Sequence, residues 1–229
     1  MWNGKKKAVT FSFDDGVTQD IKTLEILNKY GLKATFNLNS GFLGCKGEED
    51  ARGARRDKVL ASQVAKLYQG HEVAVHTLTH PNLTGLEEET IIRQVELDRK
   101  MLEELCGYEI VGMAYPCGGV NNDDRVAEII RKNTPIRYSR TITSTHNFDL
   151  QENLLRFNPT VYISRADEVE QCIQAFLETE TDKPQLFYLW GHTYEFDYGD
   201  SEWQRFEDIC KRLANRDDIF YGTNKEVLL

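Results

Sequence analysis

Two short motifs within the first 80 residues carry side chains of the kinds that bind divalent metal ions. His76 and His80 lie four residues apart in the segment His-Thr-Leu-Thr-His, a spacing that places both imidazoles on one side of a turn. Asp14 and Asp15 are adjacent carboxylates followed by Gly16, and their mutual repulsion calls for a cation or hydrogen-bond donors nearby. Taken singly, each motif is also compatible with an ordinary surface turn, so neither identifies a metal site alone.

A third feature is His192, at the end of the apolar segment Leu-Trp-Gly-His. Alone it is compatible with a half-buried structural histidine. Together with the first two motifs it completes a recognisable set. One carboxylate and two imidazoles provide three protein ligands and leave a coordination position open, as catalytic zinc sites do. One carboxylate and one histidine then remain as a general base and a general acid. The combination predicts a catalytic metal site with a general base and a general acid beside it.

The chain alternates strand-like and helix-like segments about seven times, which favours a parallel β-sheet. We expect helices around residues 21–30, 59–68, 87–105, 124–131, 167–179 and 202–215, the third of them opened by a capping box at Thr84 and Glu87. We expect strands at residues 7–13, 34–38, 72–75, 111–114, 138–141, 185–190 and 219–221, with a further possible strand at 160–163.

The predicted fold is a single α/β domain of residues 1–229 with mostly parallel strands, and a closed or distorted (β/α) barrel is favoured over an open sheet. An open doubly wound sheet usually carries a nucleotide-binding motif, and the sequence has neither GxGxxG nor a P-loop. In both architectures the chemistry is expected at the carboxyl ends of the strands.

Composition excludes several classes of partner. The formal net charge of −9 argues against nucleic acid and against anionic membranes, and it disfavours a strongly anionic polymer as substrate. No stretch approaches the roughly 20 apolar residues of a membrane span. The basic start of the chain leads directly into a strand-like run without a signal-peptide core, so the expected location is cytoplasmic. The oligomeric state is not indicated.

The order of four segments, Ser-Phe-Asp-Asp-Gly, His-Thr-Leu-Thr-His, a Pro-Cys-Gly loop and Leu-Trp-Gly-His, resembles the polysaccharide deacetylase family. This family is also called the NodB-homology domain or carbohydrate esterase family 4. The resemblance extends from Lys7 to Tyr221. It implies a distorted (β/α) barrel that hydrolyses acetamides, or in some members acetate esters, on acetylated sugars. The implied metal is zinc, with cobalt or another divalent ion as the alternative.

Roles for individual residues follow from the same resemblance. Asp14 matches the catalytic base of the family and His192 its catalytic acid. Asp15, His76 and His80 match the metal ligands. In this arrangement the metal polarises the acetyl carbonyl, the base takes a proton from water, and the acid protonates the departing amine.

The third family motif departs from the common Arg-x-Pro-Tyr pattern, because Ala114 stands at the arginine position. Tyr115, Pro116 and Cys117 form the corresponding loop, in which the backbone N–H of Cys117 can point into an oxyanion hole. We predict that Arg140, near the end of the fifth strand, replaces the missing arginine as the partner of Asp14. The alternative is an ordinary surface arginine.

The fourth family motif, a carboxylate that supports the acid histidine, has no clear match. Asp149, Glu195 and Asp197 are the candidates. Tyr194 belongs to the same aromatic and acidic stretch, 193–198, whose composition suits stacking on a sugar ring. The same stretch is also compatible with a purely structural loop.

The most favoured function is therefore removal of N-acetyl groups from an acetylated amino sugar or oligosaccharide. Three alternatives share the predicted site. They are an amidohydrolase acting on a small non-sugar amide, an O-acetyl esterase, and a non-catalytic, metal-bound carbohydrate-binding module.

Overall fold

A computed structural model describes all 229 residues. The centre of the molecule is one parallel sheet whose strands run in the order β5-β4-β3-β2-β1-β7-β6, with β8 paired to β1 as well. Consecutive strands connected through helices account for the parallel pairing. The strands are β1 (Lys7–Asp14), β2 (Ala34–Leu38), β3 (Glu72–Val75), β4 (Gly112–Ala114), β5 (Tyr138–Arg140), β6 (Val161–Tyr162), β7 (Gln185–His192) and β8 (Ile219–Tyr221).

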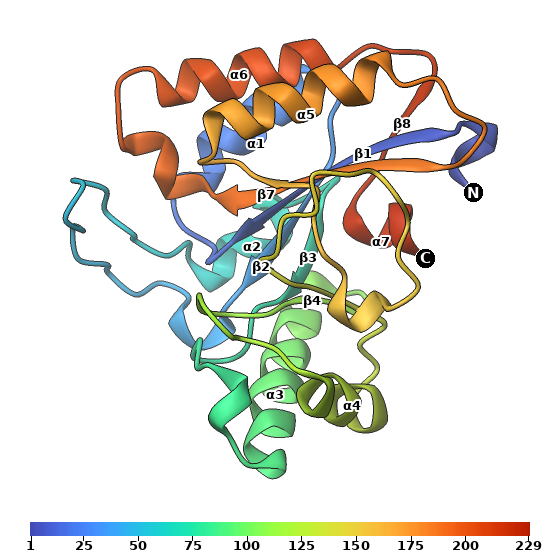
Figure 1. Ribbon diagram of the computed structural model, residues 1–229. Coiled ribbons are helices and arrows are strands. Elements are labelled where there is room, and N and C mark those ends of the chain that lie inside the picture. The colour runs from blue at the N-terminus through green and yellow to red at the C-terminus, as the bar shows by residue number, and fades with distance from the viewer.

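The sheet curls into a distorted half-barrel rather than a closed one. The edge strands β5 and β6 do not pair with each other, and a single bridge from Arg140 to Phe157 lies at the β5 edge. Figure 1 shows α1, α5 and α6 together on one side of the sheet and α3 with α4 on the other. The helices are α1 (Asp20–Lys29), α2 (Val64–Leu67), α3 (Glu88–Cys106), α4 (Asp124–Asn133), α5 (Ala166–Glu178), α6 (Glu202–Leu213) and α7 (Asn224–Leu228).

Burial of β1 explains why this strand organises the sheet. All its residues after Lys7 are buried, which suits a parallel sheet covered by helices on both faces. Its first half pairs with β8, its second half with β2, and its whole length with β7. The register places Asp14 beside His192 at the carboxyl ends of β1 and β7.

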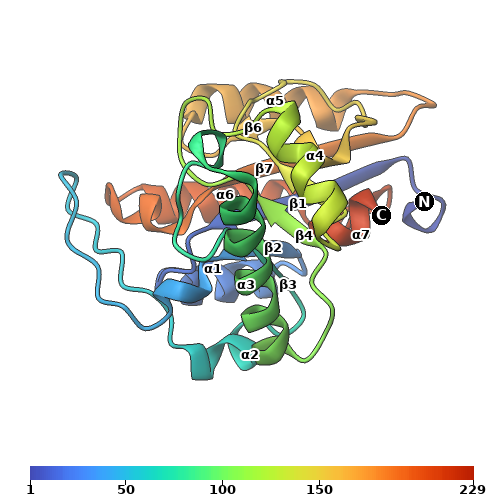
Figure 2. The same ribbon diagram turned by 90° about the horizontal axis from the view of Figure 1, so that it is seen from below.

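The two ends of the half-barrel are built differently. The short helix α7 lies at the end where β1 begins, close to both termini (Figure 1). At the opposite end, the long segment 43–60 projects beyond the body of the molecule, as the view from below also shows (Figure 2).

The predicted strands at 34–38, 72–75 and 219–221 are present with the expected bounds, and the possible strand at 160–163 is present as the two-residue β6. The capping-box prediction was wrong. Glu87 itself is the N-cap of α3, and the Thr84 hydroxyl bonds to Asn82 in a separate 3-10 turn. The helix expected at 59–68 is shorter, a 3-10 turn followed by α2. No helix was expected at α7.

None of the helices has the length and apolar character that crossing a membrane requires.

Candidate active site

The side chains of Asp15, His76 and His80 meet at the carboxyl end of the sheet. One potential ligand atom from each lies within 4.8 Å of the other two. Asp15 Oδ1 is 3.6 Å from His80 Nε2 and 3.9 Å from His76 Nε2. One carboxylate and two imidazoles in this arrangement match the donor set of a catalytic divalent-metal site with an open position.

The environment of His76 prepares it as a ligand. Its Nδ1 lies 2.9 Å from the carbonyl oxygen of Ala114, which fixes the ring and leaves Nε2 facing Asp15. Its backbone N–H donates to Asp98, a buried carboxylate on α3. Burial lowers the pKa of His76 to about 4, so the imidazole is neutral and its lone pair is available to a metal.

The backbone around the site adopts conformations that side chains rarely take. Asp15, Thr77, His80 and Cys117 all have positive φ angles, between 57° and 83°. Such conformations persist only where the surrounding structure enforces them, and they concentrate at functional sites. Two hydrogen bonds hold the Asp15 backbone in this conformation. The Asp15 N–H donates to the Asn37 carbonyl, and Lys58 Nζ donates to the Asp15 carbonyl at 2.7 Å.

Asp14, next to the candidate metal ligands, is 2% exposed and forms an ion pair with Arg140. Arg140 Nη2 donates to both carboxylate oxygens, at 2.6 and 2.5 Å. The guanidinium is fully buried and lies over the ring of Trp190, 4.4 Å from its centroid. The structure thus has the contact that the sequence analysis predicted for Arg140, which ends β5, four positions along the sheet from the β1 strand of Asp14.

The charge state of Asp14 follows from these neighbours. Burial acts to raise its pKa, but the Arg140 charge, with a smaller contribution from His76, outweighs burial and holds the pKa below the usual value. Asn37 also donates to Asp14 Oδ1 at 2.8 Å. Sequence reasoning missed Asn37, although an amide inside the largely apolar strand 34–38 was a signal for it. Asp14 Oδ2 lies 3.9 Å from His76 Nε2, so the ionised carboxylate is adjacent to the candidate metal ligands.

His192 lies at the end of β7 with its side chain 19% exposed. Its Nδ1 is 3.5 Å from Glu195 Oε1, at ion-pair distance but without hydrogen-bond geometry. Tyr162 donates a hydrogen bond to the same carboxylate oxygen. Burial opposes a charged imidazole here, but the Glu195 carboxylate and the Asp15 charge outweigh it and raise the pKa of His192. Of the three carboxylates considered for its support, Glu195 is therefore the one in place.

The other two candidates lie elsewhere. Asp149 is exposed and forms a backbone bridge with Gln185, the first residue of β7, whereas His192 is the last. An eight-residue strand separates them by more than about 20 Å, so Asp149 cannot support the histidine. Asp197 accepts hydrogen bonds from Gln19 and Trp203 instead. Both predictions were wrong because residue type and chain proximity do not report which way a loop turns.

The loop that follows β4 closes the site on a third side. Tyr115 is buried, with its hydroxyl on the Leu155 carbonyl, and Asn121 bonds to the carbonyl oxygens of Pro116 and Cys117. The Cys117 backbone N–H has no partner within the chain. Its Sγ lies 3.8 Å from His80 Nδ1, so the thiol contacts a potential metal ligand as well.

These groups line a cavity of about 460 Å³. Asp14, Asp15, His76, His80, Cys117 and His192 are accessible from it, and four aromatic side chains form much of its wall, Tyr115, Tyr162, Trp190 and Tyr194. The Tyr194 ring lies 5.0 Å from the His192 ring. The cavity thus combines a buried ionised carboxylate, a three-ligand cluster and a histidine with a raised pKa, bordered by surfaces on which a sugar ring can stack.

The sequence profile of the polysaccharide deacetylase family matches residues 2–134, more than half of the chain. The chain belongs to the polysaccharide deacetylase family. The matched part contains Asp14, Asp15, His76, His80 and the loop of Tyr115 to Cys117, but neither Arg140 nor His192.

Curated relatives from this family are bacterial. A peptidoglycan-N-acetylmuramic acid deacetylase of Bacillus subtilis is 28% identical over 124 residues, which cover 52% of this chain and 23% of that protein. A peptidoglycan-N-acetylglucosamine deacetylase of Listeria monocytogenes is 29% identical over 126 residues, covering 54% of this chain and 24% of that protein. The matched segment therefore spans about a quarter of each relative's length.

Solved structures share the fold over nearly the whole chain. A family 4 carbohydrate esterase from Streptomyces lividans, in complex with acetate, has a TM-score of 0.59 at 17% identity, covering 96% of this chain and 93% of that one. An acetyl xylan esterase from Clostridium thermocellum, in complex with a cobalt ion, has a TM-score of 0.60 at 16% identity, covering 96% and 90%. A family 4 pseudoenzyme from Bacillus anthracis has a TM-score of 0.60 at 19% identity, covering 98% and 66%.

Proposed function

We propose that this protein is a metal-dependent deacetylase that hydrolyses the acetamide of an N-acetylated amino sugar within an oligosaccharide. The observation that carries the proposal is the joint arrangement around one cavity: Asp14 paired with Arg140, the cluster of Asp15, His76 and His80, and His192 on the neighbouring strand end.

The donor set fits a divalent ion of the zinc or cobalt type. Two imidazoles and one carboxylate suit these metals, and the neutral, oriented imidazole of His76 suits them further. Asp15, His76 and His80 would hold the ion. Such an ion supplies a Lewis acid that activates water and polarises the acetyl carbonyl.

The chain's own residues supply the proton transfers. Asp14, kept ionised by Arg140, accepts a proton from the attacking water. The free N–H of Cys117 donates to the oxygen on which negative charge develops. His192, whose pKa is raised by the adjacent Glu195 carboxylate, protonates the nitrogen that leaves.

The position of His192 beside the Glu195 carboxylate, which raises the pKa of the imidazole, favours an amide over an ester as the substrate. An amine is a poor leaving group unless it is protonated as the carbon–nitrogen bond breaks, so amide hydrolysis needs an acid that is still protonated near neutral pH. The aromatic wall of the cavity favours a sugar over a small non-sugar amide, because flat apolar sugar faces stack on such rings. The names of the peptidoglycan deacetylase relatives are in line with both choices.

The test is acetate release from N-acetylglucosamine oligomers by zinc-loaded protein, with Asp14→Asn as the matched variant. We expect release by the wild type and a loss of about 10²–10⁴-fold in the variant, the usual contribution of a general base. Zinc content is expected to stay the same, since Asp14 is not a ligand in this scheme.

Stoichiometric zinc without acetate release would contradict the proposal and favour a non-catalytic role; one of the solved structures that share this fold is a pseudoenzyme. Faster release from O-acetylated xylan than from the N-acetylated oligomers would identify an esterase instead.

A further inference from the structure

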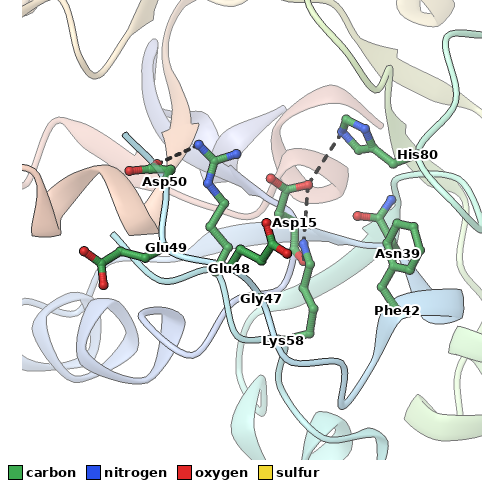
Figure 3. Close-up of a pocket in the computed structure, with 10 residues that line it drawn as sticks. Asp15, Asn39, Phe42, Gly47, Glu48, Glu49, Asp50, Lys58 and His80 are labelled. Atoms are coloured by element: carbon green, nitrogen blue, oxygen red, sulfur yellow. Dashed lines mark hydrogen bonds and ion pairs between the residues drawn. The ribbon is translucent and has the colours of Figure 1, made fainter. Parts of the chain in front are cut away.

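A second cavity, of about 480 Å³, adjoins the one described above (Figure 3). The two cavities share Asp15, Arg56 and His80 as lining residues, so they form one continuous depression around the metal-ligand cluster. The outer wall of the second cavity is the segment 47–50, in the projecting part of the chain. In an oligosaccharide substrate, a sugar bound in this second cavity would be next to the sugar whose acetamide is hydrolysed.

The free hydrogen-bonding capacity of this cavity is mostly acceptor capacity. Glu48 forms no ion pair in the structure, and Figure 3 shows its carboxylate turned toward the side where Asp15 and Lys58 lie, whereas Glu49 points away. Asp50, by contrast, is occupied by Arg56 and by the Tyr198 hydroxyl.

Asn39 provides a second and independent acceptor. It is 2% exposed, and its Nδ2 donates to the carbonyl oxygens of His76 and Thr77, at 2.6 and 2.9 Å. These two bonds fix which end of the amide is the oxygen. That oxygen has no partner in the chain, and it is turned toward Asp15 and Lys58 (Figure 3). A buried acceptor without a partner costs free energy unless a ligand or a water molecule supplies a donor.

The cationic groups of the cavity are largely engaged. Lys58 Nζ bonds to the Asp15 carbonyl at 2.7 Å and lies 3.7 Å from its carboxylate. Arg56 Nη2 bonds to Asp50 at 2.8 Å and its guanidinium lies over the Tyr194 ring, while its Nε has no partner. The unpaired Glu48 carboxylate and Asn39 oxygen therefore favour a ligand group that donates hydrogen bonds to them, such as an ammonium group.

We propose that this cavity is a subsite for an amino sugar with a free ammonium group, next to the acetylated sugar in the catalytic cavity. The proposal rests on the deacetylase function proposed above and narrows its substrate to partly deacetylated oligosaccharides. Glu48 receives the ammonium group and Asn39 Oδ1 accepts from a sugar hydroxyl or the same ammonium. A sugar that carries a carboxylate at this position is disfavoured, because it would meet Glu48.

The experiment compares three disaccharides of β-1,4-linked glucosamine. In one of them both amines are acetylated, and the other two are the isomers with a single acetyl group. The readout is kcat/KM for acetate release at low ionic strength. We expect one monoacetylated isomer to be the better substrate by about three- to ten-fold, the size of one charge-assisted contact near a surface. Because the contact is partly solvated, the advantage is expected to shrink in high salt.

The matched variants are Glu48→Gln and Glu49→Gln, which remove the same charge one residue apart. Glu48→Gln is expected to bring the ratio of the two kcat/KM values to about one, whereas Glu49→Gln retains most of the preference. The subsite would be overturned if the wild type had equal kcat/KM values for the monoacetylated and diacetylated disaccharides. It would also be overturned if the two variants lost the preference to the same extent.

A binding measurement separates failure of the subsite from failure of the deacetylase function. Calorimetry on zinc-loaded Asp14→Asn protein compares the affinities of the monoacetylated and diacetylated disaccharides without turnover. Tighter binding of the monoacetylated sugar supports the subsite even if no acetate is released by the wild type. Acetate release with no such difference in binding or in kcat/KM supports the enzyme and refutes the subsite.

Discussion

Two buried carboxylates stand at opposite ends of the same sheet and have opposite electrostatic environments. Asp14 is the last residue of β1 and is 2% exposed, and Glu72 is the first residue of β3 and is 7% exposed. The pKa of Asp14 is held below its usual value, whereas the pKa of Glu72 is raised. Similar burial therefore produces an ionised group at one end and a group biased toward protonation at the other.

The difference arises from the donors. Asp14 faces the guanidinium of Arg140, whose full charge outweighs the cost of burial. Glu72 receives hydrogen bonds only from neutral groups, the hydroxyls of Thr35 and Tyr138 and the N–H of Lys225, and burial dominates. Neutral donors satisfy a carboxylate without holding it ionised as strongly as a buried cation does.

Access differs as well. The first turn of α7 covers Glu72: the N–H of Asn224 bonds to Thr35 and that of Lys225 bonds to Glu72. At the other end no helix covers Asp14, which lines an open cavity. A buried carboxylate becomes a candidate catalyst where a cation fixes its charge and the chain leaves a path for substrate. Four sets of substitutions test this contrast, and Arg140→Met has the largest expected effect.

Arg140→Met removes the cation that distinguishes the two ends. Loss of one partner of a buried ion pair typically costs about 3–5 kcal/mol of unfolding free energy, and denaturant unfolding measures it. Because the lowered pKa of Asp14 stabilises the fold at pH values above that of the unfolded carboxyl, the deficit should be largest near neutral pH and should shrink in acid. The acid limb of the pH–rate profile should move to higher pH, since Asp14 then titrates higher. An unchanged profile would mean that Asp14 is not the base.

His76→Ala and His71→Ala compare the two ends of β3. His76 follows the strand and faces Asp15, whereas His71 precedes it and contacts Asn28 and the Ala34 N–H. We expect His76→Ala to weaken zinc binding by about 100-fold or more, because a direct ligand is lost, and His71→Ala to leave zinc affinity within a few-fold. Competition with a chromogenic chelator measures both. Equal losses would show that the metal effect is indirect.

Glu195→Gln and Asp197→Asn compare two carboxylates that follow β7. Glu195 faces His192, and Asp197 bonds to Gln19 and Trp203. Glu195→Gln should lower kcat by about 10-fold and move the basic limb of its pH profile to lower pH, because the Glu195 charge raises the pKa of His192. Asp197→Asn should leave the limb where it is. A shift in the second variant only would assign the support of His192 to Asp197.

Glu72→Gln tests the closed end of the sheet. The raised pKa of Glu72 means that the folded state favours the protonated carboxyl, so its contribution to stability is largest below the unfolded pKa and is lost as pH rises through the folded value. The variant should therefore gain about 1 kcal/mol relative to the wild type between mildly acidic and alkaline pH. Acetate release should change little. A pH-independent difference in unfolding free energy would indicate that Glu72 does not titrate in this range.

The strand pattern and the ligand set were accessible from the sequence for a physical reason. Buried parallel strands are continuous apolar runs, and chemistry-bearing residues must follow them, so Asp14, Asp15, His76 and His192 are found at strand ends. Arg140 was predicted as the partner of Asp14 on the same ground, because the carboxyl ends of parallel strands face one rim.

Other features depend on contacts between segments distant in the chain. Nothing local distinguishes Glu195 from Asp149 or Asp197 as the support of His192, because the choice depends on the course of the loops around β7. An amide within strand 34–38 was a signal for Asn37, but the sequence does not show its contact with Asp14, which follows from the register of β1 and β2.

The sequence by itself thus determined the alternation of strands and helices, the family, and the residue types at the rim. The tertiary structure alone decided that the barrel stays half-open, which buried carboxylates have a lowered or a raised pKa, and that Glu48 and Asn39 line a second cavity beside the candidate metal ligands. Residue type and periodicity set local structure through backbone sterics and burial, whereas charge state and access depend on distances of a few ångströms between segments that only folding brings together.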